Sequence, residues 1–208
     1  MPVDGGRTAT VEIGRTGRAV NIADMNQLST NEQFEQAMTG CRSLFVKKLH
    51  DYKASWRILR PSSLTDQLFI KAKRIRSLET KGTAMVDEGV KSEFVALINY
   101  GIVGLIQLEL GFADTVDMTN DEAIAHYDRY AHEALELMKR KNHDYDEAWR
   151  SMRVSSYTDF ILTKIERIKE IENLGGETLV SEGIGSNYMD IINYAVFGVI
   201  KLSGASEE

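Results

Sequence analysis

The chain contains two copies of one segment, and this internal repeat limits its fold more than any other feature. The phrase "KLHDYKASWRILRPSSLTDQ" in the first half returns as "KNHDYDEAWRSMRVSSYTDF" in the second half. A shift of 93 residues aligns 48–79 with 141–172, and 15 of 32 positions are identical. After one insertion, a shift of 94 aligns 88–108 with 182–202, and 9 of 21 positions are identical. Such a duplication predicts two similar structural units in one chain.

Each copy has the local signals of three helices. The first helix is predicted to begin at "STNE" (29–32) or "TNDE" (119–122), because side chains in this pattern cap the free amides of a first turn. The second is predicted to begin at "SSLTD" or "SSYTD", with Ser63 or Ser156 as the cap. A glycine-containing connection then leads to a third, more apolar helix. We expect an all-α fold in which six main helices pack as a bundle with approximate twofold symmetry.

The domain boundaries follow from the repeat. We expect residues 28–112 to form helical repeat 1 and residues 113–208 to form helical repeat 2, packed together as one compact unit. The first 24 residues are rich in Gly, Thr and Arg and show no helical period. A flexible N-terminal extension is therefore predicted over residues 1–27.

The composition predicts a soluble, cytoplasmic protein. Hydrophobic residues make up 43% and charged residues 27% of the chain, and the formal net charge of −6 argues against non-specific binding to nucleic acid. Cys41 is the one cysteine, so no intrachain disulfide is possible and a reducing compartment is expected. The most apolar run, residues 94–108, is shorter than the roughly 20 residues of a membrane span. The N-terminus lacks the apolar stretch of a signal peptide.

Two basic residues in the second helix of each copy are candidates for a site. On a helical wheel Lys164 falls inside the apolar stripe of its helix, and Arg167 falls at the margin of that stripe. Lys71 and Arg74 repeat the arrangement in the first copy. A lysine that faces the core must pair with a carboxylate, extend to solvent or bind an anionic ligand. Both a structural ion pair and a ligand contact agree with this pattern.

Oxygen-bearing side chains line one edge of the third helix in the second copy. Glu182, Asp190 and Asn193 project within about 80° of one another, and such oxygens are the ligands that Mg²⁺ accepts. The first copy keeps Glu88 but has Ala96 where the second has Asp190. We therefore expect any metal site to use the carboxylates of the second copy, joined by Glu88 or by Glu93. The alternative is that Asn193 and Tyr194, which the first copy keeps as Asn99 and Tyr100, simply bond to a neighbouring helix.

The Trp-Arg loops between the first and second helices have two possible roles, one in ligand binding and one in stabilising the fold. An aromatic face at Trp149, beside Arg150 and Arg153, could stack a base and hold phosphate oxygens. Alternatively, the tryptophan of each loop is buried and its arginine pairs with Asp51 or Asp144, which would stabilise the fold.

These residues carry a resemblance to a known family. The pattern "HDY…WR…R…SS.TD…K..RI" followed by "EG…NY" resembles the nucleotide-modification-associated helical domain in a tandem two-copy form, over roughly residues 28–203. The resemblance implies an α-helical protein of nucleotide metabolism, in a family formerly classed as a domain of unknown function. The chain is more loosely similar to the MazG-type all-α nucleoside triphosphate pyrophosphohydrolases, which hold Mg²⁺ with Glu and Asp. It departs from them because it lacks E-x-x-E followed by E-x-x-D on successive helices.

Two functions from different classes follow. The first is a nucleotide-binding protein that hydrolyses (d)NTPs with Mg²⁺. Its expected catalytic residues are Glu182, Asp190, Lys164 and Arg167; its ligand-binding residues are Lys71, Arg74, Trp149, Arg150, Arg153 and Asn193; and its metal ligands are Glu182, Asp190, Glu88 and Glu93. The second is a non-enzymatic helical module that binds a nucleotide or a protein. The expected partner is a nucleotide or another phosphorylated small molecule, without duplex nucleic acid or a membrane, and the sequence leaves a homodimer open.

Overall fold

The computed structural model describes residues 28–82, 89–177 and 182–204, and within them the chain is all-α. The predicted flexible extension at 1–27 lies outside the described residues. The helices of the first repeat are α2 (Thr30–Tyr52), α3 (Pro61–Lys81) and α4 (Val90–Leu110), with a short 3₁₀ turn, η1 (Ser55–Ile58), after α2. Those of the second are α5 (Asn120–Tyr145), α6 (Val154–Asn173) and α7 (Ile184–Gly204), with η2 (Ala148–Ser151) after α5. The predicted tandem three-helix repeats are confirmed.

The predicted caps of the first helices are present, and those of the second helices are not. The hydroxyl of Ser29 accepts from the backbone N–H of Glu32, whose carboxylate accepts from Ser29 N at 2.8 Å, and Thr119 forms the same box at α5. In contrast, α3 begins at Pro61 and α6 at Val154, and Arg60 and Arg153 hold the N-cap positions without a side-chain hydrogen bond. The prediction that Ser63 and Ser156 cap these helices is wrong. Proline at the first helical position has the right φ and needs no N–H partner there, so α3 begins earlier.

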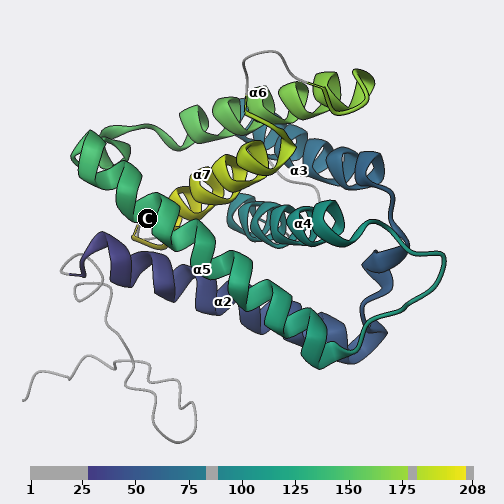
Figure 1. Cartoon of the computed structure of the whole chain (residues 1–208). Coiled ribbons are helices and arrows are strands. Elements are labelled where there is room, and N and C mark those ends of the chain that lie inside the picture. The colour runs from purple at the N-terminus through teal and green to yellow at the C-terminus, as the bar shows by residue number, and fades with distance from the viewer. Residues whose placement is uncertain (1–27, 83–88, 178–181, 205–208) are drawn as a thin grey trace, which may run out of the picture.

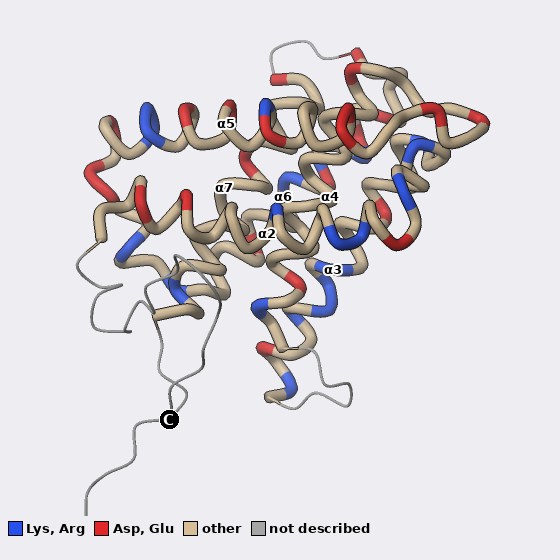
Figure 2. The backbone as a smooth tube through the Cα atoms, turned by 90° about the horizontal axis from the view of Figure 1, so that it is seen from below, with Lys and Arg blue, Asp and Glu red and all other residues tan. Residues whose placement is uncertain are grey.

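The helices form three layers, and each layer contains one helix from each repeat (Figure 1). The apolar helices α4 and α7 pack against each other in the middle, α2 and α5 lie side by side on one face, and α3 and α6 lie on the other. The two helices of the middle layer are the third helices of the two repeats, and the repeats share one hydrophobic core. Figure 2 shows that charged residues gather on the outer helices and are sparse on α4 and α7.

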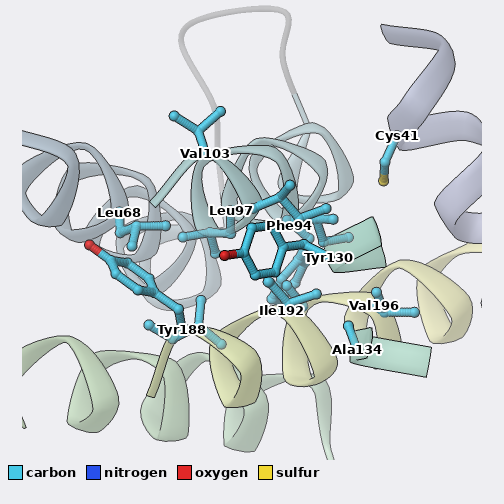
Figure 3. Packing of buried hydrophobic residues seen from close by; sticks show 14 of the residues in the cluster. Cys41, Leu68, Phe94, Leu97, Val103, Tyr130, Ala134, Tyr188, Ile192 and Val196 are labelled. Carbon is cyan, nitrogen blue, oxygen red and sulfur yellow. The ribbon is translucent and has the colours of Figure 1, made fainter. Parts of the chain in front are cut away.

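The contact between α4 and α7 is close because glycines face aromatic rings across it. Figure 3 shows the two aromatic residues, Phe94 and Tyr188, among the buried hydrophobic side chains. A Cβ atom at Gly104 would lie 2.7 Å from the ring of Tyr188, and one at Gly198 would lie 3.0 Å from the ring of Phe94. A shift of 94 relates the two glycines and the two aromatic residues. Each of the two helices therefore packs a glycine against an aromatic ring of the other helix.

Helix α4 is long and apolar enough, by composition alone, to cross a membrane. Its most apolar window is 61% buried inside the bundle, where α7 and α3 cover it. The core helix of a helical bundle has this same composition.

Candidate functional site

A buried ion-pair cluster joins the three helices of the second repeat. The side chain of Asp190, on α7, is 8% exposed and bonds to the ammonium groups of Lys164 on α6, at 2.6 Å, and of Lys141 on α5. Burial alone would raise the pKa of Asp190, but hydrogen bonds and positive charge from the two lysines outweigh it and hold that pKa below its usual value. Of the residues predicted from the wheel, Lys164 and Asp190 do come together.

The first repeat has a similar cluster, shifted by one helical turn. Glu93 on α4 is 1% exposed; its carboxylate lies 3.1 Å from the Lys71 ammonium and bonds to the guanidinium of Arg74. In the sequence alignment of the two repeats, Glu93 corresponds to Asn187 and Ala96 corresponds to Asp190. Each repeat therefore pairs one buried acid of its third helix with the lysine that both repeats keep. The two acids stand three positions apart in the alignment. Lys71, Arg74 and Lys164 therefore form structural ion pairs, which is one of the two interpretations of the sequence pattern.

The other predicted site residues lie apart from these clusters or outside the described part. Glu182 is exposed just before α7, and Arg167 is exposed on α6; the described residues provide neither side chain with an ion pair. Arg153 is exposed at the start of α6. Asn193 is buried, and the described residues offer its amide no hydrogen bond. Glu88 lies outside the described residues.

Two of the four predicted magnesium ligands are not free to bind a metal ion. Glu93 and Asp190 are each bonded to two cationic side chains, which compete with a metal ion for the same oxygens. Within the described ranges, no group of three or more His, Cys, Asp and Glu side chains is placed to hold one ion.

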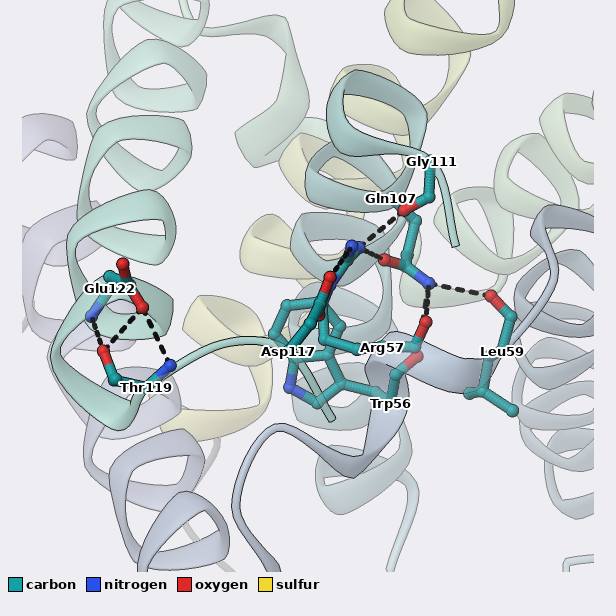
Figure 4. A network of polar contacts seen from close by, with 8 residues as sticks. All are labelled: Trp56, Arg57, Leu59, Gln107, Gly111, Asp117, Thr119 and Glu122. Atoms are coloured by element: carbon teal, nitrogen blue, oxygen red, sulfur yellow. Dashed lines mark hydrogen bonds and ion pairs between the residues drawn. The ribbon is translucent and has the colours of Figure 1, made fainter. Parts of the chain in front are cut away.

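The Trp-Arg loop of the first repeat forms a polar network that fixes the link between the repeats (Figure 4). Arg57 is 3% exposed and donates to the Asp117 carboxylate at 2.8 and 3.1 Å, to Gly111 O at 2.6 Å and to Gln107. The amide of Gln107 donates in turn to the carbonyls of Arg57 and Leu59. This arginine stabilises the fold, as one reading predicted, but its partner is Asp117. The predicted partner Asp51 is exposed and contacts His50 instead.

The same loop in the second repeat differs because Lys201 replaces Gln107. Its ammonium donates to the carbonyls of Arg150, at 2.8 Å, and Met152, at 2.6 Å, so it holds the same turn. It has no oxygen to accept from an arginine and adds a positive charge, and Arg150 is directed outward to Glu147 at 2.5 Å. The guanidinium carbon of Arg150 lies 4.5 Å from the Trp149 ring. The predicted ligand residues Trp149 and Arg150 are therefore engaged by the protein itself, and Arg150 pairs with Glu147 where Asp144 was predicted.

A pocket of about 300 Å³ opens in the first repeat, between the end of α2, the η1 turn and α4. We call it the first-repeat pocket. Four aromatic residues and two lysines lie among its lining residues, which are Phe45, Lys48, Leu49, Tyr52, Lys53, Ser55, Trp56, Ile58, Leu59, Ala96, Asn99, Tyr100 and Val103. Lys48 and Lys53 are exposed, and their ammonium groups have no ion-pair partner in the part of the chain that the structure describes.

Substitutions between the repeats explain why the first-repeat pocket is open. Ala96 lines it where the second repeat has Asp190, and Val103 lines it where the second repeat has Phe197. The Phe197 ring stacks on Trp149, with centroids 4.4 Å apart and planes 6° apart. In the second repeat, larger side chains thus take up the corresponding space. The sequence alignment contains this difference at Ala96, but by itself it indicates only the loss of a metal ligand.

The sequence pattern of both repeats matches a known family. Residues 48–108 and 141–202 each match the family described as nucleotide modification associated domain 1. The chain belongs to this family. Its two nucleotide modification associated domains run from the last turns of α2 and α5 through α4 and α7, so they include most of the first-repeat pocket and both ion-pair clusters.

Beyond the family, no curated protein and no solved structure matches the chain. The looser similarity to MazG-type pyrophosphohydrolases therefore stays a prediction.

Proposed function

We propose that this nucleotide modification associated protein binds a nucleotide in the first-repeat pocket. The observation that carries the proposal is the combination of a pocket of about 300 Å³, an aromatic lining and two lysines without partners among the described residues. Small-molecule sites have this character, with a mainly apolar and aromatic wall and few polar groups that set orientation. The description of the family supports the same class of ligand.

Each part of the pocket has a matching part in a nucleotide. Tyr52, Trp56 and Tyr100 offer aromatic surface on which a base can stack. Lys48 and Lys53 offer ammonium groups to phosphate oxygens, and the second repeat has the opposite charge, Asp146, at the position of Lys53. This local positive charge attracts an anion even though the chain carries a net charge of −6.

The proposal is for binding, which is the part of the predicted function that the pocket supports. Hydrolysis of (d)NTPs with Mg²⁺ would need carboxylates free to hold the metal, whereas Glu93 and Asp190 are neutralised by their own cationic neighbours. Turnover stays a prediction, and the binding experiment tests it in the same samples.

Calorimetric titration of the full chain with nucleoside mono- and triphosphates, with and without Mg²⁺, tests the proposal. We expect saturable binding, and we expect Lys48→Ala to weaken it about tenfold or more because one charge-assisted contact is lost. The matched control is Lys47→Ala, which removes the same charge from an exposed neighbour that does not line the pocket. No binding by the wild type, or equal affinity of the two variants, would overturn the proposal. Phosphate or pyrophosphate release in the same samples reports turnover.

A further inference from the structure

The second repeat places a carboxylate where the first-repeat pocket has empty space. Asp190 and Ala96 occupy the same position of the third helix, and Lys141 corresponds to Lys48. In the second repeat the carboxylate of Asp190 bonds to Lys141 and, at 2.6 Å, to Lys164. In the first repeat Ala96 ends in a methyl group, and Lys48 has no ion-pair partner within the described ranges.

The second repeat also places an aromatic ring against its tryptophan. Phe197 stacks on Trp149 with nearly parallel planes, whereas Val103 stands at this position in the first-repeat pocket and leaves Trp56 without a stacked ring from α4. Asp190 and Phe197 are seven residues apart, which is about 10 Å along one face of a helix. One helix thus presents an anion and an aromatic ring together, at two positions where the first repeat has only small side chains.

We propose that Asp190 and Phe197 imitate the ligand of the first-repeat pocket, and that the ligand's anionic group binds beside Ala96 and Lys48 while its aromatic ring stacks on Trp56. This inference rests on the proposed function and adds to it the place of each part of the ligand. The second repeat is then the same site in a closed form, filled by its own side chains. The chain binds one ligand, in its first repeat.

The closed site can be opened by removing the carboxylate. Asp190→Ala leaves Lys141 and Lys164 facing a space the size of a small anion, and inorganic phosphate should occupy it. We expect phosphate to raise the Tm of Asp190→Ala by more than it raises the Tm of the wild type or of Asp190→Asn, because all three proteins keep the first-repeat pocket but the asparagine amide fills the space in the second repeat. If phosphate raises the Tm of all three proteins equally, the second repeat holds no such site and the inference is wrong.

The first-repeat pocket can be closed by the reverse change, which tests the inference even if Asp190→Ala does not fold. Ala96→Asp places a carboxylate next to Lys48, so we expect nucleotide binding to weaken at least about tenfold more than in Ala96→Asn, a variant of equal size without charge. Equal affinity of the two Ala96 variants would overturn the assignment of the anion to this place.

The two experiments separate the inference from the proposed function. The phosphate effect on Asp190→Ala uses no nucleotide, so it stands or fails on the second repeat alone. A wild type that binds no nucleotide, together with a phosphate-stabilised Asp190→Ala, would refute the proposed function and keep the anion site. Nucleotide binding that Lys48→Ala weakens but Ala96→Asp does not would keep the function and refute the assigned place.

Discussion

The hydroxyl of Thr65 donates a 2.8 Å hydrogen bond to the carboxylate of Glu172, across the contact between α3 and α6. Its pseudo-symmetric counterpart, Thr158, donates a 2.9 Å bond to Glu79 in the opposite direction. Each bond joins the start of one helix to the end of the other repeat's helix. The two repeats are therefore held together by reciprocal polar contacts as well as by the shared α4–α7 core.

These carboxylates predict a dependence of stability on pH. Burial raises the pKa of Glu172 above its ordinary value of 4.5, more than the bond from Thr65 lowers it. A carboxyl whose pKa is raised in the folded state contributes stability that is fully present below the unfolded pKa and is lost as pH rises through the folded value. We therefore expect Glu172→Gln to be more stable than the wild type at pH 7 and no more stable near pH 4, in urea unfolding at both pH values.

The control for this prediction is Glu170→Gln, an exposed position on the same helix, which should change the free energy of unfolding by less than about 0.5 kcal/mol at either pH. Glu79→Gln should repeat the result of Glu172→Gln, since burial raises the pKa of Glu79 as well. A Glu172→Gln variant with the same pH profile as the wild type would contradict the argument.

The buried acid of the first repeat is predicted to be important for stability. Glu93→Gln removes the charge that Lys71 and Arg74 share, and leaves two cations facing a neutral amide in the interior. Breaking a buried pair in this way costs about 3 kcal/mol, and the partial exposure of both cations reduces the expected loss to about 2 kcal/mol. Equilibrium unfolding in urea measures it. A Glu93→Gln/Lys71→Met double variant should recover part of the loss, because one of the two uncompensated charges is gone; a fully additive loss would count against the pair.

The glycines between α4 and α7 are predicted to be sites where a single methyl group is not tolerated. In Gly104→Ala the new Cβ would lie 2.7 Å from the buried ring of Tyr188, which is held by close packing and cannot easily move. Overpacking of this kind costs about 1–3 kcal/mol. The matched control is Gly40→Ala, at an exposed position in α2 with no atom near the new Cβ, where a gain of about 0.5–1 kcal/mol is expected from helix propensity. Thermal unfolding should move Tm in opposite directions for the two variants.

The two Trp-Arg loops are predicted to respond differently to the same substitution. Arg57→Lys keeps a charge but cannot bond to both oxygens of Asp117 and to Gly111 and Gln107 together, so we expect a loss of about 2 kcal/mol. Arg150→Lys, at the aligned and exposed position, should lose less than about 0.5 kcal/mol. Similar losses in the two variants, measured by urea unfolding, would show that burial of the Arg57 network adds little.

Much of the fold follows from the internal repeat and from residues that are close together in the sequence. The repeat, the all-α class and the capping boxes at Ser29 and Thr119 were predictable, because a cap or an apolar stripe depends on residues within one or two turns of a helix. The position of Lys164 on its helix wheel likewise showed that this lysine lies in the apolar stripe and must pair with a carboxylate, extend to solvent or bind an anionic ligand.

Only the packing of the helices decided which partners these residues have. Lys164 meets Asp190 and Lys71 meets Glu93, at positions one turn apart, because the angle and offset between neighbouring helices determine which side chains come together. Arg57 finds its carboxylate 60 residues away, in the segment that joins the repeats. The first-repeat pocket depends on packing as well. Two small side chains, Ala96 and Val103, open a space only because η1 and the end of α2 lie over them, and no local pattern reports that contact.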